Sequence, residues 1–133
     1  MAGLDRSETM VQQAQRRNAA AIQAGRVELQ RADASAIPYA DASFNKVFSI
    51  NVAHFWSDPL AVLAVLQRVL VPGGLVAIAI QPRIPNATEV TSQQTGQFLV
   101  NALIADGFEQ VRLETNPMQP VSVVCALGFK QEI

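Results

Sequence analysis

The sequence predicts an α/β fold with a mostly parallel sheet that ends in a C-terminal antiparallel hairpin. Two apolar runs, 44–50 and 75–80, are separated by one helix-length segment. Such a unit places two parallel strands side by side, joined by a crossover that is almost always right-handed. Two further strand-like runs, 108–115 and 121–129, flank a short turn with two prolines, which is typical of a hairpin. At 133 residues the chain has the size of one domain, so we expect a single domain over 1–133.

The N-terminal third is predicted to contain one helix and one strand. Residues 1–5 are too few to predict a strand by themselves. Asp5, Ser7 and Glu8 are suited to the first turn of a helix, which is expected to end at Gly25. Its moderately apolar face recurs at helical spacing and comprises Met10, Val11, Ala14, Asn18, Ala21 and Ile22. Residues 26–32 then alternate apolar and polar side chains, which predicts a strand that ends at Asp33.

The crossover in the middle of the chain has clear boundaries. A turn at 41–43 leads into the strand at 44–50, and a polar and aromatic loop at 51–57 follows. Asp58 and Pro59 are a typical N-cap and first helical residue, so we expect a helix over 58–70. Its buried side is expected to hold Leu60, Leu63, Leu66, Val69 and Leu70, with Gln67 and Arg68 on the solvated side. The Pro-Gly-Gly segment 72–74 is expected to break the chain before the strand at 75–80.

The segment after that strand is predicted to be a loop or lid followed by a helix. Residues 81–94 contain two prolines and several Ser and Thr, which favours a loop. Thr95 is expected to cap the helix, and Asp106-Gly107 to end it. The apolar positions of this helix are Phe98, Leu99, Ala102 and Leu103.

Composition and charge exclude several classes of partner. The formal net charge is −1 and there is no basic stripe, so we expect no nucleic-acid partner. Every apolar stretch is shorter than the ~20 residues of a membrane span, so we expect no membrane insertion. Cys125 is the single cysteine, which excludes an internal disulfide and fits a reduced, cytoplasmic compartment. One histidine and one cysteine cannot form an ordinary zinc site, so we expect no metal.

The loop at 51–57 is the predicted position of chemistry. In sheets of this kind, ligands bind beyond the carboxyl ends of the strands. The loop holds His54 and Trp56, which are the only histidine and the only tryptophan of the chain.

Four short motifs follow one another along the chain. They are Gly3-Leu4-Asp5-Arg6-Ser7 with Met10 and Ala14, Ala32-Asp33-Ala34 with Ile37-Pro38-Tyr39, Asp41-Ala42-Ser43-Phe44, and Arg68-Val69-Leu70-Val71-Pro72-Gly73-Gly74. In this order and spacing they resemble the class I S-adenosylmethionine-dependent methyltransferases, particularly the small-molecule group, over nearly the whole chain. The resemblance implies a Rossmann-like methyltransferase fold, S-adenosylmethionine as cofactor and a small molecule as methyl acceptor.

The resemblance also implies how the adenosine part of the cofactor would be held. Asp5 would accept hydrogen bonds from the ribose hydroxyls, although it could also cap the following helix. Asp33 would bind the adenine amino group, and the Ala34 amide an adenine ring nitrogen. Ile37 or Tyr39 would lie against the purine face.

The residues of the 51–57 loop would serve the reacting end. The resemblance places Asn51 and Val52 along the methionine part of the cofactor, and Phe55 and Trp56 facing the acceptor. His54 is the candidate catalytic base, needed only if the acceptor must lose a proton. A structural histidine in the loop is the alternative. The acceptor pocket is expected to be built from 81–94 and 116–120, whose residues are too generic to name a substrate.

The chain departs from the family in one respect. The glycine-rich turn after the first strand is missing, because no Gly-x-Gly occurs in the sequence. We therefore expect an N-terminally truncated fold, with the first strand, that turn, the next helix and most of the second strand preceding residue 1. Such a loss exposes the edge of the central strand. Either the first strand of the chain closes directly on the central strand, or a second copy pairs with it. We expect the second arrangement, a homo-oligomer through the exposed sheet edge.

Two functions follow from these observations. The first is methyl transfer from S-adenosylmethionine to a small molecule in the complete form of the fold, weak or absent in this chain alone. The alternative is a non-catalytic, methyltransferase-like module that acts as a homo-oligomer or a partner subunit.

Overall fold

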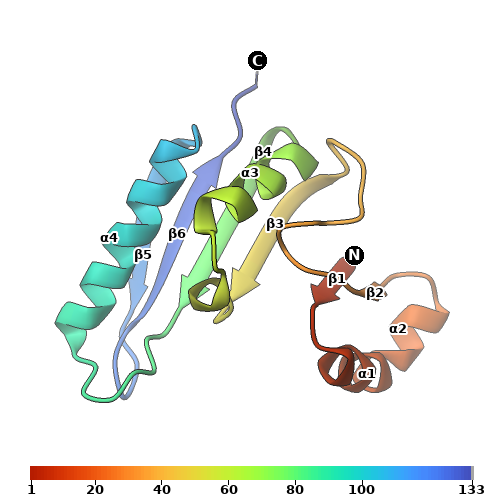
Figure 1. Ribbon diagram of the computed structural model, residues 1–133, viewed down its shortest axis with the longest axis horizontal. Helices are drawn as coiled ribbons and strands as arrows, with labels where there is room; N and C mark the ends of the chain where they lie inside the picture. Colours follow the sequence, from red (N-terminus) through yellow and green to blue (C-terminus); the bar gives the residue numbers. More distant parts are fainter. Residues whose placement is uncertain (133) are drawn as a thin grey trace. The chain divides into compact units, whose positions relative to one another are not determined.

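The computed structural model describes residues 1–132 and divides the chain into two compact units. The N-terminal unit is Met1–Pro38, and the C-terminal unit begins at Tyr39. Figure 1 shows the helices and strands of both units. That the whole chain behaves as one domain stays a prediction.

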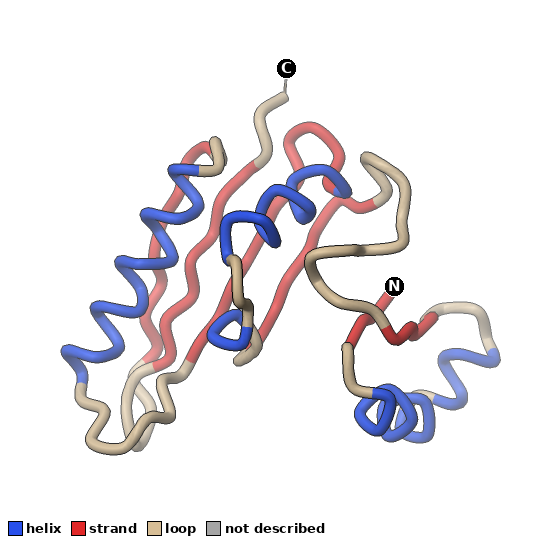
Figure 2. The backbone as a smooth tube through the Cα atoms, viewed as in Figure 1, coloured by secondary structure: helices blue, strands red, loops and turns tan. Residues whose placement is uncertain are grey.

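The N-terminal unit is a small β-α-β arrangement. Strand β1 (Ala2–Asp5) pairs in parallel with β2 (Glu28–Arg31), and these two strands form a sheet of their own. Residues 1–5 were too few to predict a strand by themselves, but all four residues of β1 have partners on β2. The tube in Figure 2 shows the connection as two helices, α1 (Glu8–Arg17) and α2 (Ala19–Gln23).

A single helix up to Gly25 was predicted, and Asn18 explains the break. Its backbone leaves the helical region, with φ −111° and ψ 20°. Its side-chain amide donates to the carbonyl oxygen of Ala14 at 2.8 Å, so the end of α1 is capped by the same residue that precedes α2.

The C-terminal unit contains a four-stranded mixed sheet. Its strand order is β3-β4-β6-β5, where β3 is Phe44–Ile50, β4 is Leu70–Ile80, β5 is Glu109–Asn116 and β6 is Val123–Phe129. β3 and β4 are parallel, and β6 pairs antiparallel with both β4 and β5. The α/β class, the parallel crossover and the C-terminal hairpin are therefore confirmed.

The Pro-Gly-Gly segment does not precede β4 but lies inside it. Phe44 pairs with Leu70 and Lys46 with Leu75, so two steps along β3 correspond to five along β4. The extra residues form a bulge that Figure 2 shows as a curl at the start of β4. The prediction of a break at 72–74 was wrong because a bulge lets the strand continue past proline and glycine.

Helices α3 (Pro59–Val69) and α4 (Glu89–Ala105) cover one face of this sheet (Figure 1). Asp58 caps α3 as predicted, accepting from the Ala61 amide at 3.2 Å. Leu60 is 50% exposed, however, and Val62 is buried in its place. The buried stripe of α3 therefore begins two residues later than expected.

Helix α4 begins at Glu89, six residues before the predicted cap at Thr95. Thr88 and Thr91 form a capping pair, in which the Thr88 amide donates to the Thr91 hydroxyl oxygen at 3.0 Å. The first turn is also tied to the residue before β6, because the Ser92 hydroxyl donates to the Ser122 carbonyl at 2.8 Å. The predicted stop is confirmed, since Gly107 follows α4 with φ +90°, a value that glycine adopts without strain.

The two faces of the sheet differ in their covering. Side chains under α3 and α4 are fully buried, among them Leu70, Val76, Ile78, Val124 and Ala126. On the opposite face Phe48 and Ile50 of β3 are 60% and 61% exposed. β3 is also the edge strand of its sheet, so this unit presents an apolar strand at an open edge.

Candidate functional site

Two carboxylates follow the two strands of the N-terminal unit. Asp5 is the last residue of β1, and Asp33 comes two residues after the end of β2. The strands are parallel and in register, with Asp5 opposite Arg31. The Asp5 carbonyl also accepts from the Ala32 amide at 3.0 Å. Asp5 and Asp33 therefore lie at the same end of the parallel strand pair β1 and β2.

Each carboxylate uses one oxygen to fix the local backbone. Oδ1 of Asp5 accepts from the Ser7 amide at 2.8 Å, but the N-cap of α1 is Ser7, whose hydroxyl oxygen accepts from the Met10 amide at 3.3 Å. Oδ1 of Asp33 accepts from the amide of Ser35 at 2.9 Å and from its hydroxyl at 2.7 Å. The Ser35 amide, then its hydroxyl, and the nearby Arg6 lower the pKa of Asp33 below its ordinary value. These interactions favour the charged form of the Asp33 carboxylate.

The remaining polar groups at this end can bind a ligand. Within residues 1–132, Oδ2 of both carboxylates and the amide of Ala34 have no hydrogen-bond partner. Ile37 is half-buried in the same unit. Tyr39 belongs to the C-terminal unit, where its ring packs edge-on against Phe44 with 5.1 Å between centroids.

The end of β3 is fixed by Asn51. Its backbone has φ +58°, and its Oδ1 accepts from the Gln81 amide at 2.8 Å. The Asn51 amide itself donates to the Ala79 carbonyl at 2.8 Å. Asn51 therefore ties the end of β3 to the end of β4, while Val52 after it is 40% exposed.

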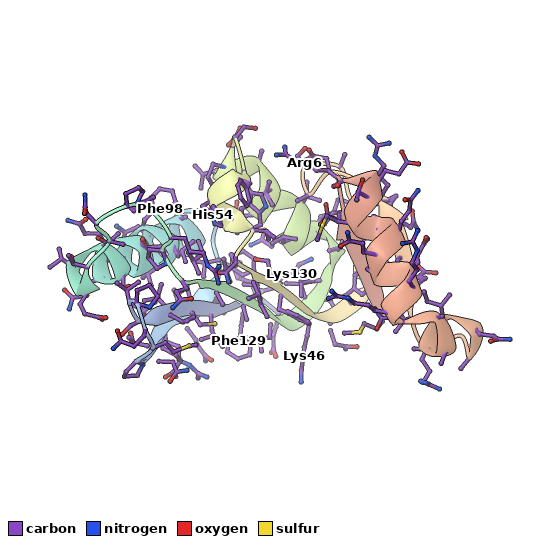
Figure 3. All side chains as sticks on the ribbon, turned by 90° about the horizontal axis from the view of Figure 1, so that it is seen from below. Arg6, Lys46, His54, Phe98, Phe129 and Lys130 are labelled. Carbon is purple, nitrogen blue, oxygen red and sulfur yellow. The ribbon has the colours of Figure 1, made fainter. Side chains whose placement is uncertain are left out.

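A pocket of about 310 Å³ lies between the loop after β3 and helix α4. The loop contains a short 3₁₀ helix, η1 (Ala53–Phe55). The pocket is lined by Ala53, His54, Trp56, Pro59, Leu63, Ile78, Ile80, Gln94, Thr95, Phe98, Leu99 and Ala102. Figure 3 shows His54 and Phe98 on the helix-covered side of the sheet, away from Lys46 and Phe129.

Of the three loop residues His54, Phe55 and Trp56, which were expected near the acceptor, two line the pocket and one does not. His54 and Trp56 line the pocket, whereas Phe55 does not and is 62% exposed. The Phe55 ring instead stacks on the His54 imidazole, with 4.1 Å between centroids and planes tilted by 43°. Phe55 therefore contacts the His54 ring and is not part of the pocket lining.

One wall of the pocket was missed by the sequence reasoning. Of the five α4 residues that line it, only Gln94 belongs to the predicted pocket segment 81–94, and none belongs to 116–120. The missed residues are Thr95, Phe98, Leu99 and Ala102. The pair Thr88 and Thr91 was the available signal, because it sets the true start of α4 and hence the face that its side chains present.

Comparison with solved structures defines the class of the protein. A crystal structure of a SAM-dependent methyltransferase from Aquifex aeolicus matches with a TM-score of 0.71 and 20% identity, over 96% of this chain and 67% of that one. At this identity the likeness shows the fold alone. The fold is that of the class I S-adenosylmethionine-dependent methyltransferases.

The sequence comparisons then give the family. The chain belongs to the family described as "Methyltransferase domain", whose model matches residues 1–78. It is 30% identical over 128 residues to an uncharacterized methyltransferase, YdaC, of Bacillus subtilis, covering 96% of this chain and 68% of that protein. It is also 30% identical to the 27-O-demethylrifamycin SV methyltransferase of Amycolatopsis mediterranei, covering 90% of this chain but 46% of that protein. The chain thus spans from about half to two thirds of these relatives.

No helix among residues 1–132 combines the length and apolarity needed to cross a bilayer.

Proposed function

We propose that the protein transfers a methyl group from S-adenosylmethionine to a small-molecule acceptor. The observation that carries this proposal is the pair Asp5 and Asp33, which lie at one end of a parallel strand pair and whose Oδ2 atoms have no hydrogen-bond partner among residues 1–132. Carboxylates in this position accept hydrogen bonds from the ribose hydroxyls and the adenine amino group. The family assignment supports the reaction class. The Amycolatopsis relative, named for a 27-O-demethylrifamycin acceptor, supports a hydroxyl as the group that is methylated.

The residues of the chain contribute binding and proton transfer. When bound, the cofactor supplies an electrophilic methyl group. His54 is exposed and lines the pocket, so its imidazole is placed to accept a proton from an acceptor hydroxyl. The Phe55 ring lies against that imidazole, with 4.1 Å between the ring centroids. The largest contribution expected of such a site is alignment of donor and acceptor.

Affinity for the cofactor should be modest in this chain. The sequence contains no Gly-x-Gly turn, so the backbone support that the family gives the methionine part is not supplied by these residues. Binding would then rest on the nucleoside end, at Asp5, Asp33 and the Ala34 amide.

Calorimetric titration with S-adenosylhomocysteine tests the proposal. Asp5→Asn and Asp33→Asn should each weaken binding, because an amide accepts more weakly than a carboxylate. Glu28→Gln is the matched control, since Glu28 is an exposed carboxylate at the opposite end of β2 and should leave binding unchanged. Equal affinities for all four proteins would contradict the assignment of the two aspartates.

The open edge of β3 favours a second candidate function, a non-catalytic module that associates with a second copy. β3 has seven residues, no proline and a single charge at Lys46, so it lacks most of the features that protect edge strands. Two copies related by a two-fold axis could pair β3 with β3. A folded protein that dimerises in sedimentation experiments but does not bind S-adenosylhomocysteine would favour this reading.

For either function we propose a reducing, cytoplasmic compartment, since Cys125 cannot form a disulfide within the chain.

A further inference from the structure

We propose that the pocket between η1 and α4 binds a compact, uncharged, two-ring aromatic molecule that carries a hydroxyl group. Its assignment as the methyl-acceptor site rests on the proposed function, but binding itself does not require the cofactor. The inference comes from the size of the pocket, the chemistry of its lining and its place in the sheet.

The size of the pocket limits the ligand. An apolar cavity of roughly 150 Å³ accommodates benzene, and this pocket has about 310 Å³. Two fused rings therefore fit it, whereas a single ring would leave it half empty. His54, Gln94 and Phe98 in the lining are exposed, so the pocket is open to solvent and a ligand can enter it.

The lining selects an uncharged, flat and mostly apolar molecule. Most of the lining side chains are aliphatic, and Trp56 and Phe98 add aromatic surface. No Asp, Glu, Lys or Arg is among the lining residues, so a charged ligand would lose its hydration without gaining an ionic partner. Phe98 is 57% exposed, and a ring lying against it would remove this apolar surface from water.

Three polar residues can recognise one hydroxyl group. His54 and Gln94 are exposed lining residues and Thr95 is half-buried. The Thr95 hydroxyl already donates to the Thr91 carbonyl at 2.9 Å, so towards a ligand it can only accept. His54 and Gln94 each offer either a donor or an acceptor. Pockets with an apolar lining and a few polar groups are typical small-molecule sites.

The pocket also lies where ligands bind in such sheets. η1 begins three residues after the end of β3, and Ile80 is the last residue of β4. Both therefore mark the carboxyl ends of the parallel pair, the side on which ligands of α/β sheets are found.

Calorimetric titration of the whole chain with 2-naphthol, without cofactor, tests the inference. We expect 2-naphthol to bind, and 2-naphthoate, of similar size but negatively charged, to bind at least about tenfold more weakly. Ala102→Phe fills the pocket from α4 and should abolish 2-naphthol binding. Ala105→Phe adds the same ring at an exposed position of the same helix and should leave binding unchanged.

A second variant distinguishes a filled pocket from a misfolded protein. Ala102 is only 9% exposed, so Ala102→Phe could unfold the protein. Thr95→Phe, at a half-buried lining position, should then give the same loss of binding with a native circular dichroism spectrum. No binding of 2-naphthol to the folded protein, equal binding of 2-naphthoate, or equal weakening by Ala105→Phe would each overturn the inference. Binding of 2-naphthol by a protein that does not bind S-adenosylhomocysteine would instead contradict the proposed function alone.

Discussion

Asn51 is expected to stabilise the fold in two separable ways. Its Oδ1 accepts from the Gln81 amide, and its backbone has a left-handed φ of +58°. Gln81 is only 7% exposed, so its backbone N–H would lack a hydrogen-bond partner if Asn51 lost its side chain. Alanine at position 51 removes the acceptor and strains the backbone, glycine removes the acceptor alone, and aspartate keeps an acceptor.

The magnitudes follow from these two contributions. An unsatisfied buried amide costs about 1–3 kcal/mol, and a left-handed alanine costs about 1–2 kcal/mol. Asn51→Ala should therefore lower the free energy of unfolding by roughly 2–5 kcal/mol. Glycine costs about 0.4–1 kcal/mol through the greater freedom of the unfolded chain, so Asn51→Gly should be less destabilised than Asn51→Ala by at most about 1.6 kcal/mol. Asn51→Asp should be close to the wild type.

Urea denaturation followed by circular dichroism measures all three variants on one scale. A glycine variant that is less stable than the alanine variant by about 1 kcal/mol would show that the backbone is unstrained at this position. An aspartate variant as unstable as the glycine variant would refute the hydrogen bond to Gln81.

Three further predictions concern other parts of the chain. Burial raises the pKa of Asp106 above its ordinary value, so stability should fall as pH rises from near 4 through the raised pKa. Asp106→Asn, at the carboxyl end of α4, should be more stable than the wild type at neutral pH by roughly 0.3–1 kcal/mol. This difference should disappear in denaturation curves recorded below about pH 4, where Asp106 is protonated in both states. Gly74→Ala would place a Cβ 2.8 Å from the Val71 carbonyl and 3.0 Å from that of Asn45, and should lower the urea midpoint by the equivalent of about 1–3 kcal/mol. Phe48→Glu should shift the sedimentation coefficient from dimer to monomer, and a wild type that sediments only as a monomer would contradict association through β3.

Much of the architecture could be predicted because local signals agreed with the final packing. The apolar run of β3, the Asp58-Pro59 start of α3 and the glycine after α4 each have one strong local interpretation. The order of short motifs gave the family, since it depends on spacing and not on any single residue. Asp5 and Asp33 were proposed from the same motifs, and the structure places them at the end of β1 and two residues after β2.

The errors arose where distant contacts decide the structure. The bulge at 72–74 exists because β3 and β4 remain paired on both sides of it, which their separate sequences do not show. The start of α4 depends on Thr88 and Thr91 and on the Ser92 bond to a residue 30 positions away. The structural use of Asn51 depends in the same way on Gln81, a partner that no spacing rule identifies.

The boundary at Pro38 and Tyr39 has a practical consequence for anyone who dissects this chain. The family match covers residues 1–78, but a fragment ending there would cut through β4, which continues to Ile80. Such a fragment would also leave out β6, the neighbour on which β4 depends in the sheet. A division after Pro38 severs no strand pairing, so recombinant halves, isotope labelling by segment and engineered insertions should all be planned around that peptide bond.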